Sequence, residues 1–161
     1  MASAYRIITT RNEFLDALRE AFAAMASNGC REVWLCDDDF ADWPLNEPEV
    51  VEHLSAWALP HRKLTVLARS FEEVTRRHPR WVEWRRQFSH VVECRSLEEA
   101  QPGDLLPMLL APGLVVVRLA DPVHLRGSVS HSVADAVQGR ESIDALLQRS
   151  AEAFPATILG L

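Results

Sequence analysis

Hydrophobic and polar positions follow two different periods along the first 95 residues of the chain. Four short apolar runs have the composition of strands, at residues 5–9, 32–36, 63–68 and 90–94. Between them, helical spacing and capping signals predict three helices, at residues 10–27, 47–59 and 70–88. Pro79 is expected to bend or restart the third helix. Strands that alternate with helices of this length predict parallel pairing, with helices packed on both faces of one sheet.

The pattern changes after residue 95. Three apolar runs, separated by Pro112-Gly113 and Asp121-Pro122, predict a β-meander over residues 105–111, 114–119 and 124–129. A last helix is predicted over residues 143–154. Repeats and linker-like segments are not evident, so residues 1–161 are expected to form one α/β domain with a mixed sheet, helices on both faces, a C-terminal β-meander and a terminal helix.

Composition limits the classes of partner. The chain is 48% hydrophobic and 25% charged, as globular proteins are, and its formal net charge of -6 makes nucleic-acid and membrane partners unexpected. Cys30, Cys36 and Cys94 have no CxxC spacing, so neither a disulfide framework nor a structural zinc site is predicted, and no cofactor is expected. No apolar segment has the length of a signal peptide core or a transmembrane helix, which together with the unpaired cysteines predicts a cytoplasmic protein.

The acidic stretch CDDDFADWPLN has two interpretations. It follows a predicted strand at the sheet edge where α/β enzymes bind ligands, so Asp37 and Asp39 could hold a metal ion for phosphoryl transfer. The dehalogenase-type form of that motif, Asp-x-Asp-x-Thr, has Thr where this chain has Ala41. We favour a turn whose carboxylates bond their own backbone and cap the next helix, with Trp43 and Leu45 as apolar anchors.

An arginine-rich stretch, TRRHPRWVEWRRQF, is the second candidate for binding chemistry. Arginines beside aromatic residues can bind phosphate or stack on bases, which opens the alternative of a nucleotide or nucleic-acid binder. However, Trp81, Trp84 and Phe88 fall on one helical stripe and are predicted to be the core face. Candidate anion-binding residues are the basic side chains of this stretch and of the later strands: Arg80, Arg85, Arg86, Arg118, His124 and Arg126.

The order of elements, with a loop of the form DxDxxxWPLN after the second strand, resembles a phospholipase D-like domain. In that superfamily a strand carries His-x-Lys-x4-Asp, followed by Gly. The stretch LLPMLLAPGLVVVRL fits this frame with Leu105 in the His place, Pro107 in the Lys place, Pro112 in the Asp place and Gly113 at the turn. The segments CDDDFADWPL, RRHPRWVEWRR and DALLQRSAEAFP are also similar to uncharacterised proteobacterial proteins.

The resemblance implies a domain without the superfamily's chemistry, because Leu and Pro supply neither a nucleophile nor a cation. Lys63 is the single lysine of the chain, and in HRKLTVLA the residue at the Asp place is Ala68. No catalytic residue is therefore assigned, and the sequence favours a binding, scaffolding or regulatory module over an enzyme. Because superfamily half-domains pair across their motif strands, a homodimer is expected, with a protein or a small anionic molecule as a further partner.

Overall fold

The computed structural model describes residues 5–155. Its elements follow in this order: β1 (Tyr5–Ile8), α1 (Arg11–Asn28), β2 (Glu32–Cys36), α2 (Pro48–Trp57), β3 (Lys63–Ala68), α3 (Glu72–Arg77), α4 (Pro79–Gln87), β4 (Val92–Ser96), β5 (Met108–Ala111), β6 (Val115–Asp121), β7 (Arg126–Ser130), α5 (Val133–Leu147) and β8 (Ala151–Glu152). The four early strands and the three meander strands lie where the apolar runs predict them.

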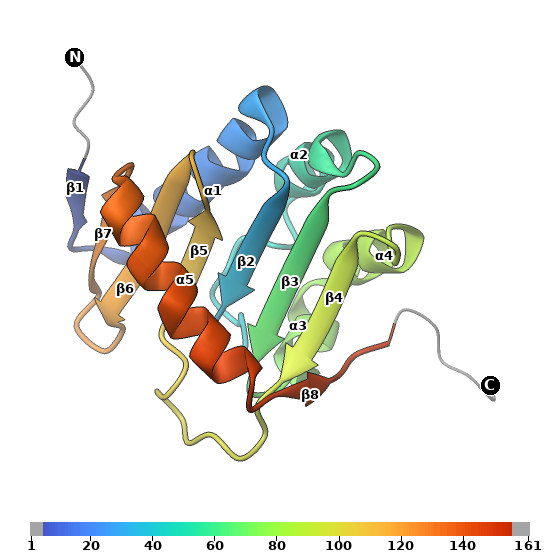
Figure 1. Cartoon of the computed structure of the whole chain (residues 1–161). Helices are drawn as coiled ribbons and strands as arrows, with labels where there is room; N and C mark the ends of the chain where they lie inside the picture. The colour runs from blue at the N-terminus through green and yellow to red at the C-terminus, as the bar shows by residue number, and fades with distance from the viewer. Residues whose placement is uncertain (1–4, 156–161) are drawn as a thin grey trace.

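One mixed sheet contains the eight strands in the order β1-β7-β6-β5-β2-β3-β4-β8. Only β2, β3 and β4 pair in parallel, and β5 joins the antiparallel meander to the edge of β2. The alternating pattern predicts that the first strand pairs in parallel with the other early strands, and this prediction is wrong. It pairs antiparallel with β7 at the far edge, so that α1 crosses the sheet before the chain enters β2 (Figure 1).

Helices cover both faces of the sheet, which confirms the predicted fold class. The first four helices lie on one face and α5 lies alone on the other (Figure 1). The predicted position of the last helix is wrong, because α5 begins ten residues earlier than expected. The Ser132 hydroxyl accepts a hydrogen bond from the Asp135 amide and caps the helix. Beyond α5, Arg95 donates to the Ser150 carbonyl at 2.8 Å, and the chain continues as β8 beside β4.

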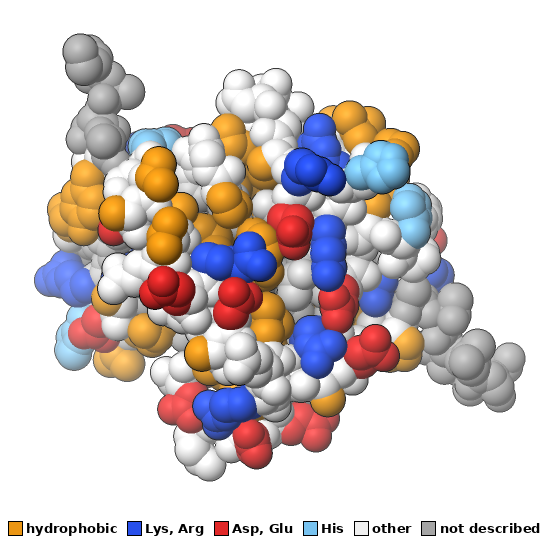
Figure 2. Space-filling model, in the orientation of Figure 1, with side chains coloured by type: hydrophobic (Ala, Val, Ile, Leu, Met, Phe, Trp, Pro, Cys, Tyr) orange, Lys and Arg blue, Asp and Glu red, His pale blue; other side chains and the backbone are white. Residues whose placement is uncertain are grey.

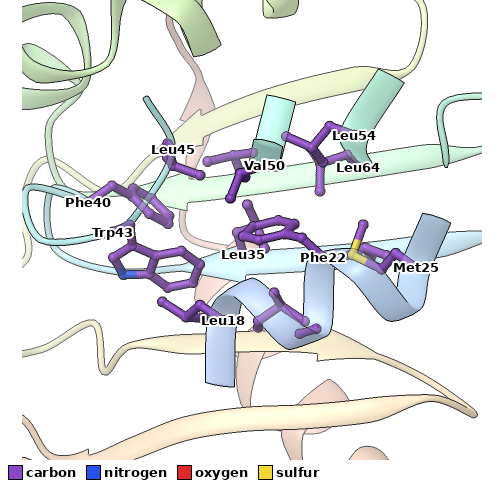
Figure 3. Packing of buried hydrophobic residues seen from close by; sticks show 14 of the residues in the cluster. Leu18, Phe22, Met25, Leu35, Phe40, Trp43, Leu45, Val50, Leu54 and Leu64 are labelled. Carbon is purple, nitrogen blue, oxygen red and sulfur yellow. The ribbon is translucent and has the colours of Figure 1, made fainter. Parts of the chain in front are cut away.

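The larger part of the core lies between the sheet and the first four helices. Leu18, Phe22 and Met25 of α1 are buried at the helical spacing that the sequence shows, and they pack toward Leu35 of β2 (Figure 3). The loop after β2 adds Phe40, Trp43 and Leu45 to the same layer, and α2 adds Val50 and Leu54. The helices are therefore fixed on the sheet by large side chains, and the acidic loop is anchored by its own aromatic residues.

The arginine-rich stretch forms two helices rather than one bent helix. Pro79 begins α4, and His78 lies between α3 and α4 with its Nε2 atom 2.7 Å from the Phe40 carbonyl oxygen. Trp81 and Trp84 are buried, as their spacing predicts. The aromatic residues of this stretch thus belong to the core and are not available for stacking on a ligand.

Candidate functional site

The acidic loop lies at the carboxyl end of β2, where the sequence places it. The Asp37 carboxylate accepts hydrogen bonds from the backbone amides of Asp39 at 3.2 Å and Phe40 at 2.7 Å, and the Asp39 carboxylate accepts one from Ala41 at 3.0 Å. Phe40 has a φ of 59°, in the left-handed region that a tight turn requires. These carboxylates stabilise the turn, as predicted. They do not cap the next helix, because α2 begins at Pro48 and Glu47 makes no side-chain cap bond.

The same loop is tied to two neighbouring segments. One Asp38 carboxylate oxygen accepts a hydrogen bond from the Gly103 amide at 2.6 Å, and the Asp38 carbonyl accepts one from Arg69 at 2.8 Å. Burial raises the pKa of Asp37 to about 6, against the opposing effect of the two amides that bond it. Within residues 5–155, no three His, Cys, Asp or Glu side chains are grouped so that they could hold a metal ion.

One of the places that the resemblance assigns to catalytic residues lies beside a cavity of about 480 Å³ between α5 and the sheet. Leu105 is only 1% exposed and belongs to the core under α5, and Pro107 lines the cavity. Pro112 and Gly113 form the turn between β5 and β6, where Gly113 has a φ of 83°. The assigned places therefore do not meet in one site: Pro107 lines the cavity under α5, whereas Pro112 and Gly113 lie at the other end of β5, and the His and Lys places hold apolar side chains.

The arginines of α4 do not form one site. Arg80 donates to the Asn46 carbonyl at 3.1 Å, and Arg86 lies 3.2 Å from Glu83 on the solvent side of the same helix. Arg85 is buried against the core and donates to the Phe154 carbonyl at 3.3 Å. The three guanidinium groups therefore point to three different surroundings.

The candidates on the later strands are also separated. Arg118 lies on β6 and lines the cavity under α5. Arg126 begins β7 and is exposed, opposite Asp121 in the β6–β7 register. His124 lies in the turn between these strands, with its Nδ1 atom 2.8 Å from the Asp121 carboxylate. Only Arg118 therefore faces an enclosed space.

A cationic cleft that the sequence reasoning missed lies at the other end of the strands. It has a volume of about 810 Å³, and its basic side chains come from three segments: Arg31 before β2, Lys63 at the start of β3, and Arg140 on α5. Figure 2 shows Lys and Arg side chains interleaved with acidic ones across this face. The sequence could have indicated that Arg31 and Lys63 are neighbours, because they lie at the starts of two strands that are predicted to pair in parallel. In the structure Lys63 pairs with Glu32, the residue after Arg31.

Arg140 and Lys63 of the cationic cleft are each held by neighbouring side chains. The Arg140 guanidinium lies over the ring of Trp34, 4.2 Å from its centroid, and bonds Asp144 at 3.1 Å. The Lys63 ammonium lies 3.2 Å from Glu93, which also pairs with Arg95 at 3.0 Å. Within the described part of the chain Arg31 forms no ion pair. Within the described residues Arg31 is thus the member of the three without a carboxylate partner, and the cleft presents these cations at the end of the sheet where β2 and β3 begin.

Comparison with known proteins defines the class of fold first. The structure is similar to NucT from Helicobacter pylori, a phospholipase D-family nuclease, with a TM-score of 0.57, 6% identity, and coverage of 92% of this chain and 98% of that chain. It is also similar to TrmBL2, an archaeal chromatin protein with a novel mode of DNA binding, with a TM-score of 0.67, 12% identity, and coverage of 95% of this chain. The present chain spans 54% of that chain. The fold is thus phospholipase D-like.

The chain belongs to the family described as domain of unknown function DUF7931, whose pattern matches residues 15–153. No curated protein matches the sequence. The expectation that nucleic acid is an unlikely partner is wrong, since a structural neighbour of this chain is a DNA-binding chromatin protein. Net charge is a sum over the whole surface and does not exclude a local set of cations such as Arg31, Lys63 and Arg140. No helix between residues 5 and 155 is long and apolar enough to cross a membrane.

Proposed function

We propose that the chain is a phospholipase D-like binding domain that does not cleave phosphodiesters and that holds nucleic-acid phosphates in the cationic cleft. The observation that carries this proposal is the convergence of Arg31, Lys63 and Arg140 on one open face of the sheet. Cations from three segments can neutralise neighbouring phosphates along a backbone, which is the main source of affinity for nucleic acids. The likeness of the fold to a DNA-binding protein and to a nuclease supports this choice of ligand.

The absence of cleavage follows from residue types. Attack on phosphorus needs a nucleophile and cations fixed near the charge that develops. Leu105 and Pro107 supply neither in the places that the superfamily uses, and His124 is bonded to Asp121 in an exposed turn. His61 and Lys63 line the cationic cleft at the spacing of the motif's His and Lys, but Ala68 stands in the Asp place, so the bound backbone would be held and released intact.

The test compares two variants that remove the same amount of charge. One replaces Arg31, Lys63 and Arg140 by Gln, and the matched control replaces Arg76, Arg80 and Arg86 of the arginine-rich stretch by Gln. Fluorescence anisotropy is measured with a labelled 20-nucleotide single strand and the corresponding duplex, at salt concentrations from 50 to 200 mM.

For the wild type we expect binding that weakens with salt, with a logarithmic slope of about -3 on duplex and about -2 on the single strand, since about three phosphates are neutralised. The cleft variant should lose about tenfold or more in affinity at low salt, and the control should bind as the wild type does. Equal losses in both variants would contradict a defined cleft, and a larger loss in the control would transfer the site to the arginine-rich stretch.

We also propose that two copies of the chain associate through an apolar surface at the β1 edge. The run LLPMLLAPGLVVV, from which self-association is expected, is mostly buried in β5 and β6 and cannot serve. Ile7 of β1 is 55% exposed, and Val133 and Val137 are 77% and 53% exposed at the start of α5, which directly follows the partner strand of β1, β7. Figure 2 shows apolar side chains gathered there. Sedimentation velocity at micromolar concentration should give a dimer, and the Val133→Lys/Val137→Lys variant a monomer; a monomeric wild type would end the proposal.

A further inference from the structure

The cavity under α5 lies at the opposite end of the strands from the cationic cleft, and the two share no lining residue. Its inner wall is apolar, built from Met108 of β5 and from Ile143 and Leu146 of α5. Leu106, which also lines the cavity, is 44% exposed, an unusual position for a leucine in front of a buried strand. A volume of about 480 Å³ falls within the range of small-molecule sites.

Polar groups on one side of this cavity have no partner in the described part of the chain. Arg118 is half-buried, lies across from Met108 on β5 and from Ser128 on β7, and forms no hydrogen bond or ion pair there. Gln138 and Ser142, one turn apart on α5, line the same cavity, and their side chains make no hydrogen bond within residues 5–155. A guanidinium on the cavity wall without an anionic partner favours a negatively charged ligand.

We propose that this cavity binds a single-headed anionic amphiphile, a medium-chain alkyl carboxylate. The carboxylate pairs with the two-pronged guanidinium of Arg118 and accepts hydrogen bonds from Gln138 and Ser142. The alkyl chain lies along Met108 and Ile143 toward Leu106.

Two features of the cavity select this head group. A single arginine matches the geometry and charge of one carboxylate, whereas a phosphate dianion would need a second cation. Asp104 also lines the cavity and repels a dianion more strongly than a monoanion. The proposal is independent of nucleic-acid binding, because the groups that would bind phosphates line the other cleft.

The experiment uses the full chain and decanoate as the probe, below its micellar concentration, in calorimetric titration and in thermal melts. Decanol has the same chain without the charge, and acetate has the charge without the chain. Decanoate should bind saturably and raise the melting temperature, and each of the other two should bind about tenfold or more weakly. Equal binding of decanol would refute recognition of the head group, and equal binding of acetate would refute the role of the apolar wall.

The variant Arg118→Gln should lose about tenfold or more in affinity for decanoate. The control Arg126→Gln removes the same charge from the adjacent strand outside the cavity and should bind decanoate as the wild type does. Ser142→Trp, at an exposed helix position, fills the cavity and should abolish binding with the fold intact, as judged by circular dichroism. Unchanged binding by Arg118→Gln or by Ser142→Trp would overturn the proposal, as would the absence of saturable heat with the wild type.

Discussion

Replacing Asp37 by Asn should make the protein more stable at neutral pH. Burial raises the pKa of this carboxyl from 3.8 to about 6, so the folded protein favours the neutral form. Well below pH 3.8 the carboxyl is neutral in both states, and its ionisation takes nothing from stability. Between pH 3.8 and about 6 the unfolded chain ionises while the folded protein keeps the proton, so stability falls over this range and is then constant above it. The gap between 3.8 and about 6 corresponds to about 3 kcal/mol at pH 7.

Asparagine keeps the oxygen that accepts from the Phe40 and Asp39 amides, but it cannot ionise. The stability advantage of Asp37→Asn over the wild type should grow from about 0.5 kcal/mol at pH 4 to about 3 kcal/mol at pH 7. Urea unfolding at several pH values measures it. The control Asp42→Asn changes an exposed residue of the same loop, whose ion pair with Arg11 spans 3.3 Å, and should shift stability at pH 7 by less than about 0.5 kcal/mol.

A variant Asp37→Asn that is less stable than the wild type at pH 7, or a difference that does not change with pH, would refute this reasoning.

The metal-dependent alternative differs in what it predicts when a divalent ion is added. If Asp37 and Asp39 held magnesium or manganese for phosphoryl transfer, the ion would stabilise the wild type in a saturable way and leave Asp37→Asn unaffected. We expect neither ion to change the wild-type melting temperature, because the carboxylates are bonded to the backbone of their own turn.

Two further predictions concern the sheet and the chemistry. Gly127→Ala should destabilise the protein by about 1–3 kcal/mol in urea unfolding. A Cβ at Gly127 would lie 2.1 Å from the Arg118 carbonyl oxygen and would force β6 and β7 apart. A variant as stable as the wild type would show that the two strands adjust freely. The purified protein should not turn over a chromogenic phosphodiester with or without divalent metal, and activity that survives purification and disappears in His124→Ala would show that the domain is an enzyme.

The comparison of α1, α4 and α5 shows which helices and which buried residues could be predicted from helical periodicity in the sequence. Phe22 of α1 and Trp81 of α4 lie on stripes that face one large core, and their burial was predictable. The start of α5 was not, because its first turns carry exposed Val133 and Val137 and follow a cap that resembles other polar loops. This helix covers its sheet face alone, with Gly139 set against Met108 of β5, so its buried stripe is narrow.

The sequence by itself determined the strands, the buried stripes of the first helices, the turn-forming character of Asp37, and the apolar residues in the His and Lys places. Each of these depends on residue type and on contacts a few positions apart. Tertiary structure alone decided that β1 pairs with β7, and that Arg140 stacks on Trp34 and faces Lys63. Those arrangements join segments that lie far apart in the chain, and they follow from which strand edges and sheet faces remain uncovered after the local elements have formed.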